Sequence, residues 1–223
     1  MSPKIQLFTA FAAVARALGN PHRLDLLEHL AQGEKPVEAL ALKADLSFAN
    51  ASQHLQALKR VGLVEAERRG KQIVYRLASD DVHDLLAALR QVAERHTAQA
   101  QAVIEDYFHA RDRLEEVSFA ELERKLADGL VTLLDVRPPD EFADGHLPGA
   151  LNVPLADLSD ALAALPADRE IVAYCRGPWC VLAFQAVSLL RTRGRLARRL
   201  DGGLPEWRRA GRTVVTASVM QAE

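Results

Sequence analysis

Apolar residues recur every three or four positions along the N-terminal part of the chain, which predicts four helices. The first covers residues 5–18 and ends at Gly19-Asn20-Pro21, where the second begins, and the second ends at Gly33. A short third helix follows Pro36, and the fourth begins after Ser47, a residue type that caps helix N-termini well. Two short helices separated by three or four residues form a helix-turn-helix.

Two short strands are predicted after the fourth helix. Residues 63–77 read LVEAERRGKQIVYRL, in which Ile73 and Tyr75 alternate with polar neighbours after a turn at Arg69-Gly70. A helix-turn-helix followed by a basic hairpin is a winged helix, which would bind DNA. A small helical domain with a solvated, charged hairpin is the alternative.

The two sides of the fourth helix suggest how DNA would be bound. Its apolar face carries Ala51, Leu55 and Leu58. The opposite face carries the side chains expected to reach base edges in a major groove, which are Ser47, Phe48, Asn50, Gln53 and His54. Basic side chains nearby would meet phosphates, namely Lys59, Arg68, Arg69 and Lys71. The expected partner is a double-stranded DNA operator.

A long helical pattern runs from Asp80 to about Glu116. Its apolar members are Leu85, Leu86, Leu89, Val92, Val103, Ile104, Tyr107 and Phe108. A helix longer than a small domain can cover suggests a partner chain, and a twofold homodimer would set two recognition helices about one DNA turn apart. A linker helix between two domains is the alternative, and one helix can serve both roles.

The pattern changes near residue 117, where Ser118 and Glu121 form a capping box that opens a helix to Leu126. Short apolar strands then alternate with helices, which favours an α/β domain with a parallel sheet; the strands read LVTLLDV, NVPL, EIVAYC and RLARRL. In such sheets, sites lie at the carboxyl ends of strands. Cys175 stands at such an end, just before a helix that begins near Val181.

Composition places the chain among globular proteins. It has 223 residues, 49% of them apolar and 26% charged, and its net charge of −2 argues against indiscriminate nucleic-acid binding. No apolar stretch approaches the roughly 20 residues that span a bilayer, and Met1 to Ala10 lack the features of a secretion signal. A cytoplasmic protein with no membrane partner is therefore expected. A local basic patch nevertheless lies between Lys59 and Arg76.

Both cysteines of the chain, Cys175 and Cys180, lie in one turn. In the cytosol such a pair is more often reactive or metal-binding than a structural disulfide. Backbone N–H groups at a helix N-terminus, together with Arg176, would lower the pKa of the Cys175 thiol and make it a nucleophile. An inert buried cysteine is the alternative. Two cysteines are too few for a structural zinc site, and neither a metal nor a cofactor is expected.

Residues 11–78 resemble the ArsR family of winged-helix repressors, through ALGNPHRLDLLEHL and LSFANASQHLQALKRVGLVEAERRGKQIVYRL. The resemblance implies a dimer that leaves DNA when an inducer binds. Metal-sensing members carry cysteines in the helix before the recognition helix, but the corresponding segment here, EKPVEALAL, has none. Asp81 and His83 only half resemble a second metal site of the family. A metal sensor is therefore disfavoured, and the inducer must be recognised elsewhere.

Residues 117–213 resemble the rhodanese family, through LLDVRPPDEFADGHLPGALNVPL, the YCRGPWC turn and LDGGLPEWRRAGR. The resemblance implies a persulfide on Cys175, which would accept sulfur from a small donor and pass it to a thiol. It places Asp135 and Arg137 near the turn, and with Cys175, Arg176 and Cys180 they form the expected catalytic set. It also implies structural roles for His146, Gly149, Gly202 and Gly203. The turn backbone would hold the outer sulfur, and its members are Arg176, Gly177, Pro178, Trp179, Cys180 and Val181. The six-residue turn resembles that of sulfurtransferases, whereas phosphatase relatives have a longer one.

Cys180 stands where many sulfurtransferases have serine, threonine or arginine. A thiol at this position can attack the persulfide and give a disulfide or a sulfur-bridged pair, which favours sensing over turnover. Alternatively, Cys180 is only a small buried residue at the helix start.

The sequence thus predicts a two-domain protein, with a mainly α winged helix-turn-helix followed by an α/β rhodanese-like domain with a parallel sheet. The expected limits are 1–80 for the DNA-binding domain, 81–116 for a dimerisation or linker helix and 117–223 for the rhodanese-like domain. The leading hypothesis is a repressor that senses reactive sulfur. A sulfurtransferase tethered to a DNA-binding domain and a thiol redox switch are the alternatives. The operator, the sulfur donor and the sign of the response stay open.

Overall fold

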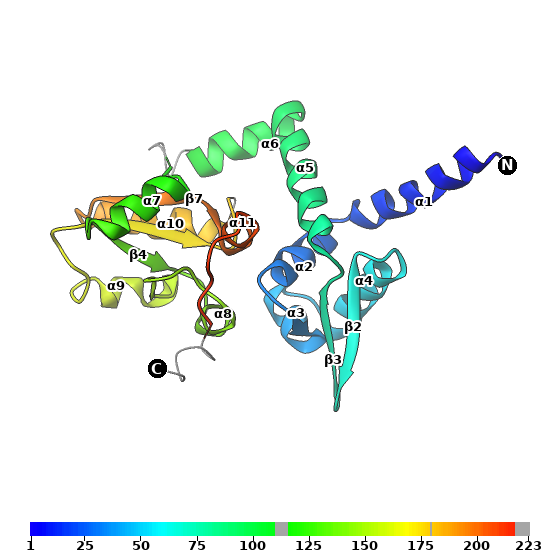
Figure 1. Ribbon diagram of the computed structural model, residues 1–223, viewed down its shortest axis with the longest axis horizontal. Helices are drawn as coiled ribbons and strands as arrows, with labels where there is room; N and C mark the ends of the chain where they lie inside the picture. The colour runs from blue at the N-terminus through cyan, green and yellow to red at the C-terminus, as the bar shows by residue number, and fades with distance from the viewer. Residues whose placement is uncertain (110–115, 179, 217–223) are drawn as a thin grey trace. The chain divides into compact units, whose positions relative to one another are not determined.

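The computed structural model describes residues 1–109, 116–178 and 180–216 (Figure 1). Its contacts divide the chain into two units, Met1–Arg90 and Gln91–Glu223. Among the described residues, no helix combines the length and the apolar character that crossing a bilayer requires.

The first unit joins short helices to a small sheet. Its elements are α1 (Pro3–Leu18), α2 (Pro21–Ala31), β1 (Lys35–Pro36), α3 (Val37–Lys43), α4 (Phe48–Arg60), β2 (Val64–Arg69) and β3 (Gln72–Leu77). The expected cap of α4 is confirmed, because Ser47 Oγ accepts a hydrogen bond from the backbone N–H of Asn50 at 3.3 Å. Ala51, Leu55 and Leu58 are fully buried in a core shared with α2 and α3, which fixes the exposed side of α4.

The hairpin after α4 forms the predicted wing. Strands pair in the order β1-β3-β2, and the pairing of Arg69 with Gln72 leaves Gly70 and Lys71 as the turn, one residue later than expected. Gly70 has φ +63°, a left-handed conformation that favours glycine. Tyr75 is buried against the core, whereas Ile73, nearer the tip, is 47% exposed. The wing therefore extends beyond the core that anchors it.

The helical pattern expected from Asp80 to Glu116 is not one continuous helix. Helix α5 (Asp80–His96) is followed by Thr97 in extended backbone, then by α6 (Ala98–Val103) and the π-helical η1 (Ile104–His109). Thr97 is β-branched, and its Oγ1 donates to the Ala93 carbonyl at 2.7 Å. Such side-chain bonding to the preceding turn competes with helix continuation. The limits proposed for this segment, 81–116, stay a prediction.

The second unit is an α/β structure. Its elements are α7 (Phe119–Ala127), β4 (Val131–Asp135), α8 (Pro139–Asp144), β5 (Leu151–Asn152), η2 (Leu155–Asp157), α9 (Leu158–Ala161), β6 (Glu170–Cys175), α10 (Val181–Thr192), β7 (Ala197–Gly203) and α11 (Leu204–Arg209). The sheet order is β5-β4-β6-β7, and each neighbouring pair is parallel. The expected fold class is confirmed. Ser118 caps α7 as predicted, accepting from the Glu121 N–H at 3.2 Å.

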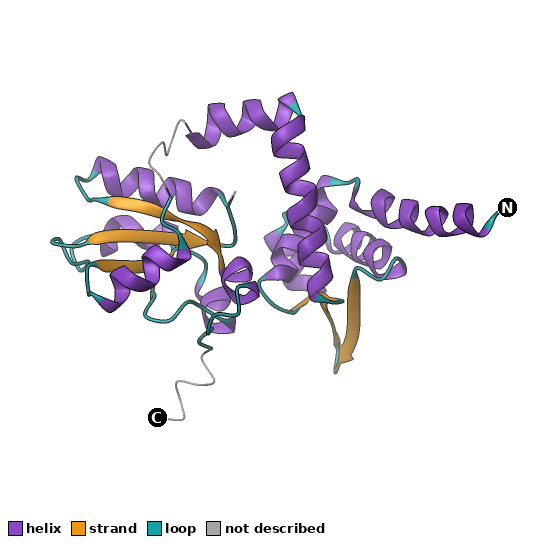
Figure 2. Cartoon of the chain, turned by 45° about the horizontal axis from the view of Figure 1, so that its top comes forward, coloured by secondary structure: helices purple, strands orange, loops and turns teal. Residues whose placement is uncertain are grey.

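Helices flank the strands of this sheet (Figure 2). Alternate residues of β6 enter two separate hydrophobic cores. Val172 and Tyr174 pack with residues of α7 and α11, as shown by Leu122 and Trp207. Ile171, Ala173 and Cys175 pack on the other face, in a core that includes α9 and α10. Cys175 therefore ends a buried strand on the α10 side of the sheet.

Candidate functional site

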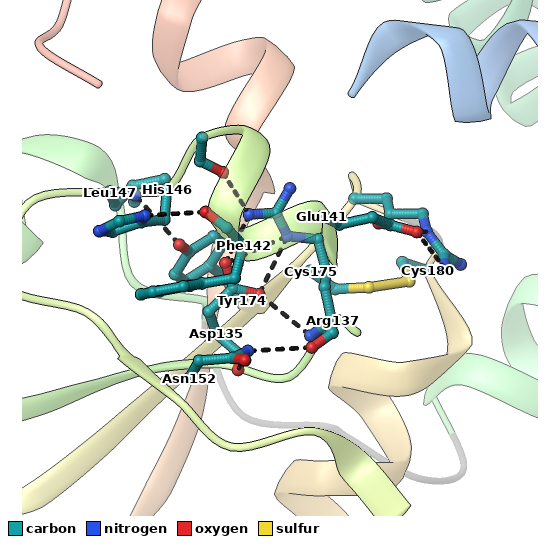
Figure 3. A network of polar contacts seen from close by, with 12 residues as sticks. Asp135, Arg137, Glu141, Phe142, His146, Leu147, Asn152, Tyr174, Cys175 and Cys180 are labelled. Atoms are coloured by element: carbon teal, nitrogen blue, oxygen red, sulfur yellow. Dashed lines mark hydrogen bonds and ion pairs between the residues drawn. A yellow bond between two sulfur atoms is a disulfide. The ribbon is translucent and has the colours of Figure 1, made fainter. Parts of the chain in front are cut away.

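The two cysteines lie at opposite ends of the turn between β6 and α10. Cys175 is the last residue of β6, and Cys180 is the N-cap of α10. The structure joins them by a disulfide, with Cα atoms 6.1 Å apart, and both side chains are buried (Figure 3). Trp179, one of the expected turn residues, lies outside the described residues. The structure thus places both thiol positions at the carboxyl edge of the sheet, where sites of α/β folds are found.

The backbone of the turn does not match the expected cradle at every position. The Cys180 N–H donates to the Gly177 carbonyl at 3.2 Å, so this amide is used inside the turn and is not directed at a bound sulfur. Pro178 has no N–H to offer. The turn is also closely approached by β7, because a Cβ on Gly203 would lie 2.5 Å from the Cys175 carbonyl oxygen. Only glycine fits there, and this agrees with the structural role expected for Gly203.

Arg176 was expected to add positive charge beside Cys175, but its guanidinium is engaged by Glu141 of α8. Arg176 Nε and Nη2 each lie 2.9 Å from a Glu141 carboxylate oxygen, and the Glu141 side chain is fully buried. The carboxylate offsets the charge of Arg176, so the ion pair anchors the turn to α8 more than it stabilises a thiolate. Glu141 was missed by the sequence reasoning, because no local pattern marks a partner 35 residues away.

Asp135 and Arg137 lie next to the turn, as expected, and their membership of the catalytic set stays a prediction. Their side chains are both 0% exposed and form an ion pair, with Arg137 Nε 2.9 Å from Asp135 Oδ1. Arg137 Nη2 also donates to the Gly145 carbonyl at 2.7 Å. Buried in this way, the pair has no exposed atom to meet a substrate, and it positions the chain on either side of α8.

Tyr174 precedes Cys175 and continues this buried network (Figure 3). Its hydroxyl accepts a hydrogen bond from the Leu147 N–H at 3.0 Å. Burial, with the nearby Asp135 carboxylate, raises the pKa of Tyr174 well above its usual value, so the phenol stays protonated. His146, expected to be structural, is buried and stacks on Phe142 with ring centroids 3.7 Å apart. The base of the turn is thus a fixed polar network.

Arg199 of β7 makes a further contact with the turn that the sequence reasoning missed. Its guanidinium is buried, lies 3.5 Å above the Phe184 ring and donates to the Pro178 carbonyl at 3.4 Å. It also forms an ion pair with Glu116. Burial raises the pKa of Glu116 and the Asp201 carboxylate adds to this, although Arg199 opposes the rise.

The face of α4 opposite its core is exposed, as predicted. Ser47, Phe48, Asn50 and Gln53 are exposed, whereas His54 is half-buried. The His54 ring lies near that of His22, with centroids 5.8 Å apart. Burial, with the charges of Arg23 and His22, lowers the pKa of His54, so a neutral imidazole is favoured. Among the residues expected to reach base edges, His54 is therefore the least exposed, and the role of the set stays a prediction.

The basic residues expected to contact phosphates are all exposed, namely Lys59, Arg68, Arg69 and Lys71. Arg69 is engaged within the protein, because its guanidinium forms ion pairs with Glu34 and, at 2.9 Å, with Glu67. Hydrogen bonds to these two carboxylates raise the pKa of Arg69 above its usual range. A phosphate would have to compete with them for Arg69.

The described ranges hold no group of three or more His, Cys, Asp or Glu side chains arranged to bind a metal ion. The side chain of His109 is not among those described.

Comparisons with known proteins match both halves of the chain. A model of the helix-turn-helix domain matches residues 18–67, and a model of the rhodanese-like domain matches residues 118–210. The HTH-type transcriptional regulator Rv0324 of Mycobacterium tuberculosis is 47% identical over 208 residues, which cover 93% of this chain and 91% of that protein. The chain belongs to this family of HTH-type transcriptional regulators.

Other relatives match only one half of this chain. A sulfurtransferase of Allochromatium vinosum is 34% identical over 102 residues, covering 45% of this chain and 89% of that protein. A solved homodimeric winged helix-turn-helix fragment from Mycobacterium bovis, a possible ArsR-family regulator, is 43% identical; the match covers 44% of this chain and 92% of that fragment, with a TM-score of 0.42. The regulator thus combines a helix-turn-helix domain with a rhodanese-like domain, and the two domains expected from the sequence are confirmed by the family models.

Proposed function

We propose that this transcriptional regulator is a repressor whose second unit detects reactive sulfur through a persulfide on Cys175. The observation that carries the proposal is the pairing of Cys175 with Cys180 across one turn, with Cα atoms 6.1 Å apart. That separation suits a disulfide, so the turn has a dithiol and a disulfide state available. A chemical signal can alter DNA binding only if it favours one of two such states.

The proposed chemistry conserves atoms and electrons. The Cys175 thiolate attacks the outer sulfur of a small persulfide, R–S–SH; the donor S–S bond breaks, R–S⁻ leaves and Cys175 becomes Cys–S–SH. The Cys180 thiolate then attacks Sγ of Cys175, the outer sulfur leaves as HS⁻ and the disulfide forms. The two cysteines are oxidised and the transferred sulfur is reduced to sulfide. Cys180 thereby acts as the resolving thiol, and a thiol reductant would reset the turn.

The first unit would supply the operator-binding surface through α4 and the wing. Helix α1 carries exposed apolar side chains, each about half exposed, which are Ile5, Leu7, Phe8 and Phe11. A cluster of this kind marks an interaction surface, and the proposed partner is a second copy of the chain. A twofold dimer would present two α4 helices to successive major grooves, and the operator would then be a pseudo-palindrome.

A sulfurtransferase enzyme is the second candidate, favoured by the relative of that name and by the position of Cys175 at a strand end. It predicts repeated sulfur transfer to cyanide or a thiol, and operator binding that ignores sulfur. A plain redox switch is the third candidate, favoured by the disulfide itself. It predicts that peroxide acts as well as a sulfur donor.

Operator binding tests the proposal. The reduced full-length protein is titrated against DNA from upstream of its own gene, before and after treatment with polysulfide or with peroxide, and Cys175→Ser and Cys180→Ser are run in parallel. Polysulfide should change the affinity of the wild type at least tenfold, about 1.4 kcal/mol of coupling, and should not affect Cys175→Ser. Equal responses to peroxide favour the redox switch. No response, with turnover that survives in Cys180→Ser, favours the enzyme.

A further inference from the structure

The chain enters the sheet of the second unit beside the cysteine turn. The Val117 N–H donates to the Arg199 carbonyl at 2.8 Å, and the Asp201 N–H donates to the Val117 carbonyl at 2.9 Å. These bonds hold Val117 against β7 as an isolated parallel bridge. Glu116, the first residue described after the gap at 110–115, is therefore fixed next to Arg199.

Arg199 joins this entry point to the turn. Its guanidinium, on a residue only 4% exposed, pairs with the Glu116 carboxylate, stacks 3.5 Å above the Phe184 ring of α10 and donates to the Pro178 carbonyl at 3.4 Å. A buried charge is stable only while it stays paired and hydrogen-bonded. Arg199 must therefore follow its partners when they move, and one of them, Pro178, lies between the two cysteines.

The segment that precedes the gap contacts the same place. Phe108 of η1 packs edge-on against Phe184, with ring centroids 4.7 Å apart and an interplanar angle of 63°. Phe108 is 9% exposed, so this contact buries it almost completely. The described residues on both sides of 110–115 thus meet one pair of stacked groups, Phe184 and Arg199.

We propose that Arg199 is a positioning residue that couples the chemical state of the cysteine turn to the residues on either side of positions 110–115, a link within the second unit. The proposal rests on the function proposed above, because it assumes that Cys175 changes state. Opening or closing the Cys175–Cys180 bond moves the Pro178 carbonyl between them. Arg199 keeps its hydrogen bonds by shifting with it, and this shift displaces Glu116 on one side of the link and, through Phe184, Phe108 on the other.

Amide hydrogen exchange of the full-length protein tests this coupling. Exchange is measured for peptides covering 104–108 and 116–122, in the dithiol state and after polysulfide treatment, at equal Cys175 modification checked by mass spectrometry. Operator affinity is measured on the same samples. The variants are Arg199→Met and, as a matched control, Arg198→Met. Arg198 lies on the same strand and also pairs with carboxylates, those of Glu121 and Glu170, so its loss removes comparable ion pairs.

In the wild type, polysulfide should change exchange in both peptides at least threefold. In Arg199→Met the change should fall below 1.5-fold, in Arg198→Met it should persist, and Arg199→Lys, which keeps the charge, should restore part of it. Three results would each overturn the proposal. They are unchanged exchange in both wild-type peptides, a change in Arg199→Met as large as in the wild type, and a change in Arg198→Met as small as in Arg199→Met. If Arg199→Met does not fold, Glu116→Gln replaces it, because this change weakens the same ion pair. The change in exchange should then also fall below 1.5-fold.

The two readouts separate this inference from the proposed function. If amide exchange depends on sulfur and on Arg199 while operator affinity stays constant, the sensing function is contradicted and the coupling through Arg199 is supported. If operator affinity responds to sulfur equally in the wild type and in Arg199→Met, the sensing function is supported and the role of Arg199 is contradicted.

Discussion

Replacing Gly203 by alanine should displace the cysteine turn. The added Cβ would lie 2.5 Å from the Cys175 carbonyl oxygen, 2.6 Å from the Arg176 carbonyl carbon and 2.7 Å from the Gly177 nitrogen. These are backbone atoms, so no flexible side chain can move aside. Reaching an ordinary contact of 3.4 Å requires β7 and the turn to separate by about 0.9 Å. Overpacking of this kind costs about 1–3 kcal/mol, and a loss of about 2 kcal/mol should lower the Tm of this unit by roughly 6–10 °C.

Tryptophan fluorescence can follow this loss in urea, because both tryptophans, at positions 179 and 207, lie in the second unit. Gly145→Ala is the matched control: its nearest neighbours are side-chain ends, with Val214 Cγ1 at 3.1 Å, and its backbone is extended with φ 163°, so its cost should stay below about 1 kcal/mol. Gly203→Ala should also slow the reaction of Cys175 with polysulfide. A Gly203→Ala protein with wild-type stability and Cys175 reactivity would refute the reasoning.

Three further predictions concern charged groups. Arg137→Met leaves the Asp135 carboxylate buried and unpaired, and should lower the unfolding free energy in urea by about 3–5 kcal/mol; a loss under 1 kcal/mol would contradict the buried pair. Glu34→Gln removes one of the two carboxylates that compete with phosphate for Arg69, and should raise operator affinity about two- to fivefold and steepen its salt dependence; unchanged binding by fluorescence anisotropy would contradict this. Burial alone would raise the pKa of Glu170, but hydrogen bonds from Lys125 and Arg198 outweigh burial and lower it. The ionised Glu170 therefore stabilises the fold above about pH 4.5, and this stabilisation is lost as the pH falls through the lowered pKa. The stability difference between the wild type and Glu170→Gln should therefore shrink between pH 6 and pH 3 in urea titrations, and a constant difference would contradict this.

Local patterns predicted the elements well because they depend on neighbours in sequence. The apolar spacing of Ala51, Leu55 and Leu58 gave the buried face of α4, and Ser47 gave its start. The same pattern failed at Thr97, where one side-chain hydrogen bond to Ala93 accompanies a break in the expected helix. Amphipathic spacing predicts which face of a helix is buried, but it does not predict where the helix is interrupted.

The partners of the cysteine turn could not be predicted in this way. Cys175 and Cys180 were visible because they are close in sequence. Glu141 pairs with Arg176 across 35 residues, and Glu116 pairs with Arg199 across 83. Periodicity carries no information about pairs so far apart, and a charged residue looks the same in sequence whether it is exposed or buried. Burial of the carboxylate or guanidinium is what makes each pair structurally important, and burial is a property of the fold.

The ion pairs also bear on how Cys175 would be activated. Arg176 and Arg199 each face a carboxylate, that of Glu141 and that of Glu116, so the nearby cations are largely compensated. Stabilisation of a thiolate must then come mainly from backbone N–H groups of the turn and from the N-terminus of α10. These groups act only in a turn conformation that directs them at Cys175, and under the proposed function the bond to Cys180 would form and break within that turn. If opening the disulfide alters the turn, as the proposed function requires, the reactivity of Cys175 would depend on the conformation of the turn, and such dependence would suit the proposed sensor better than an enzyme that needs one fixed site.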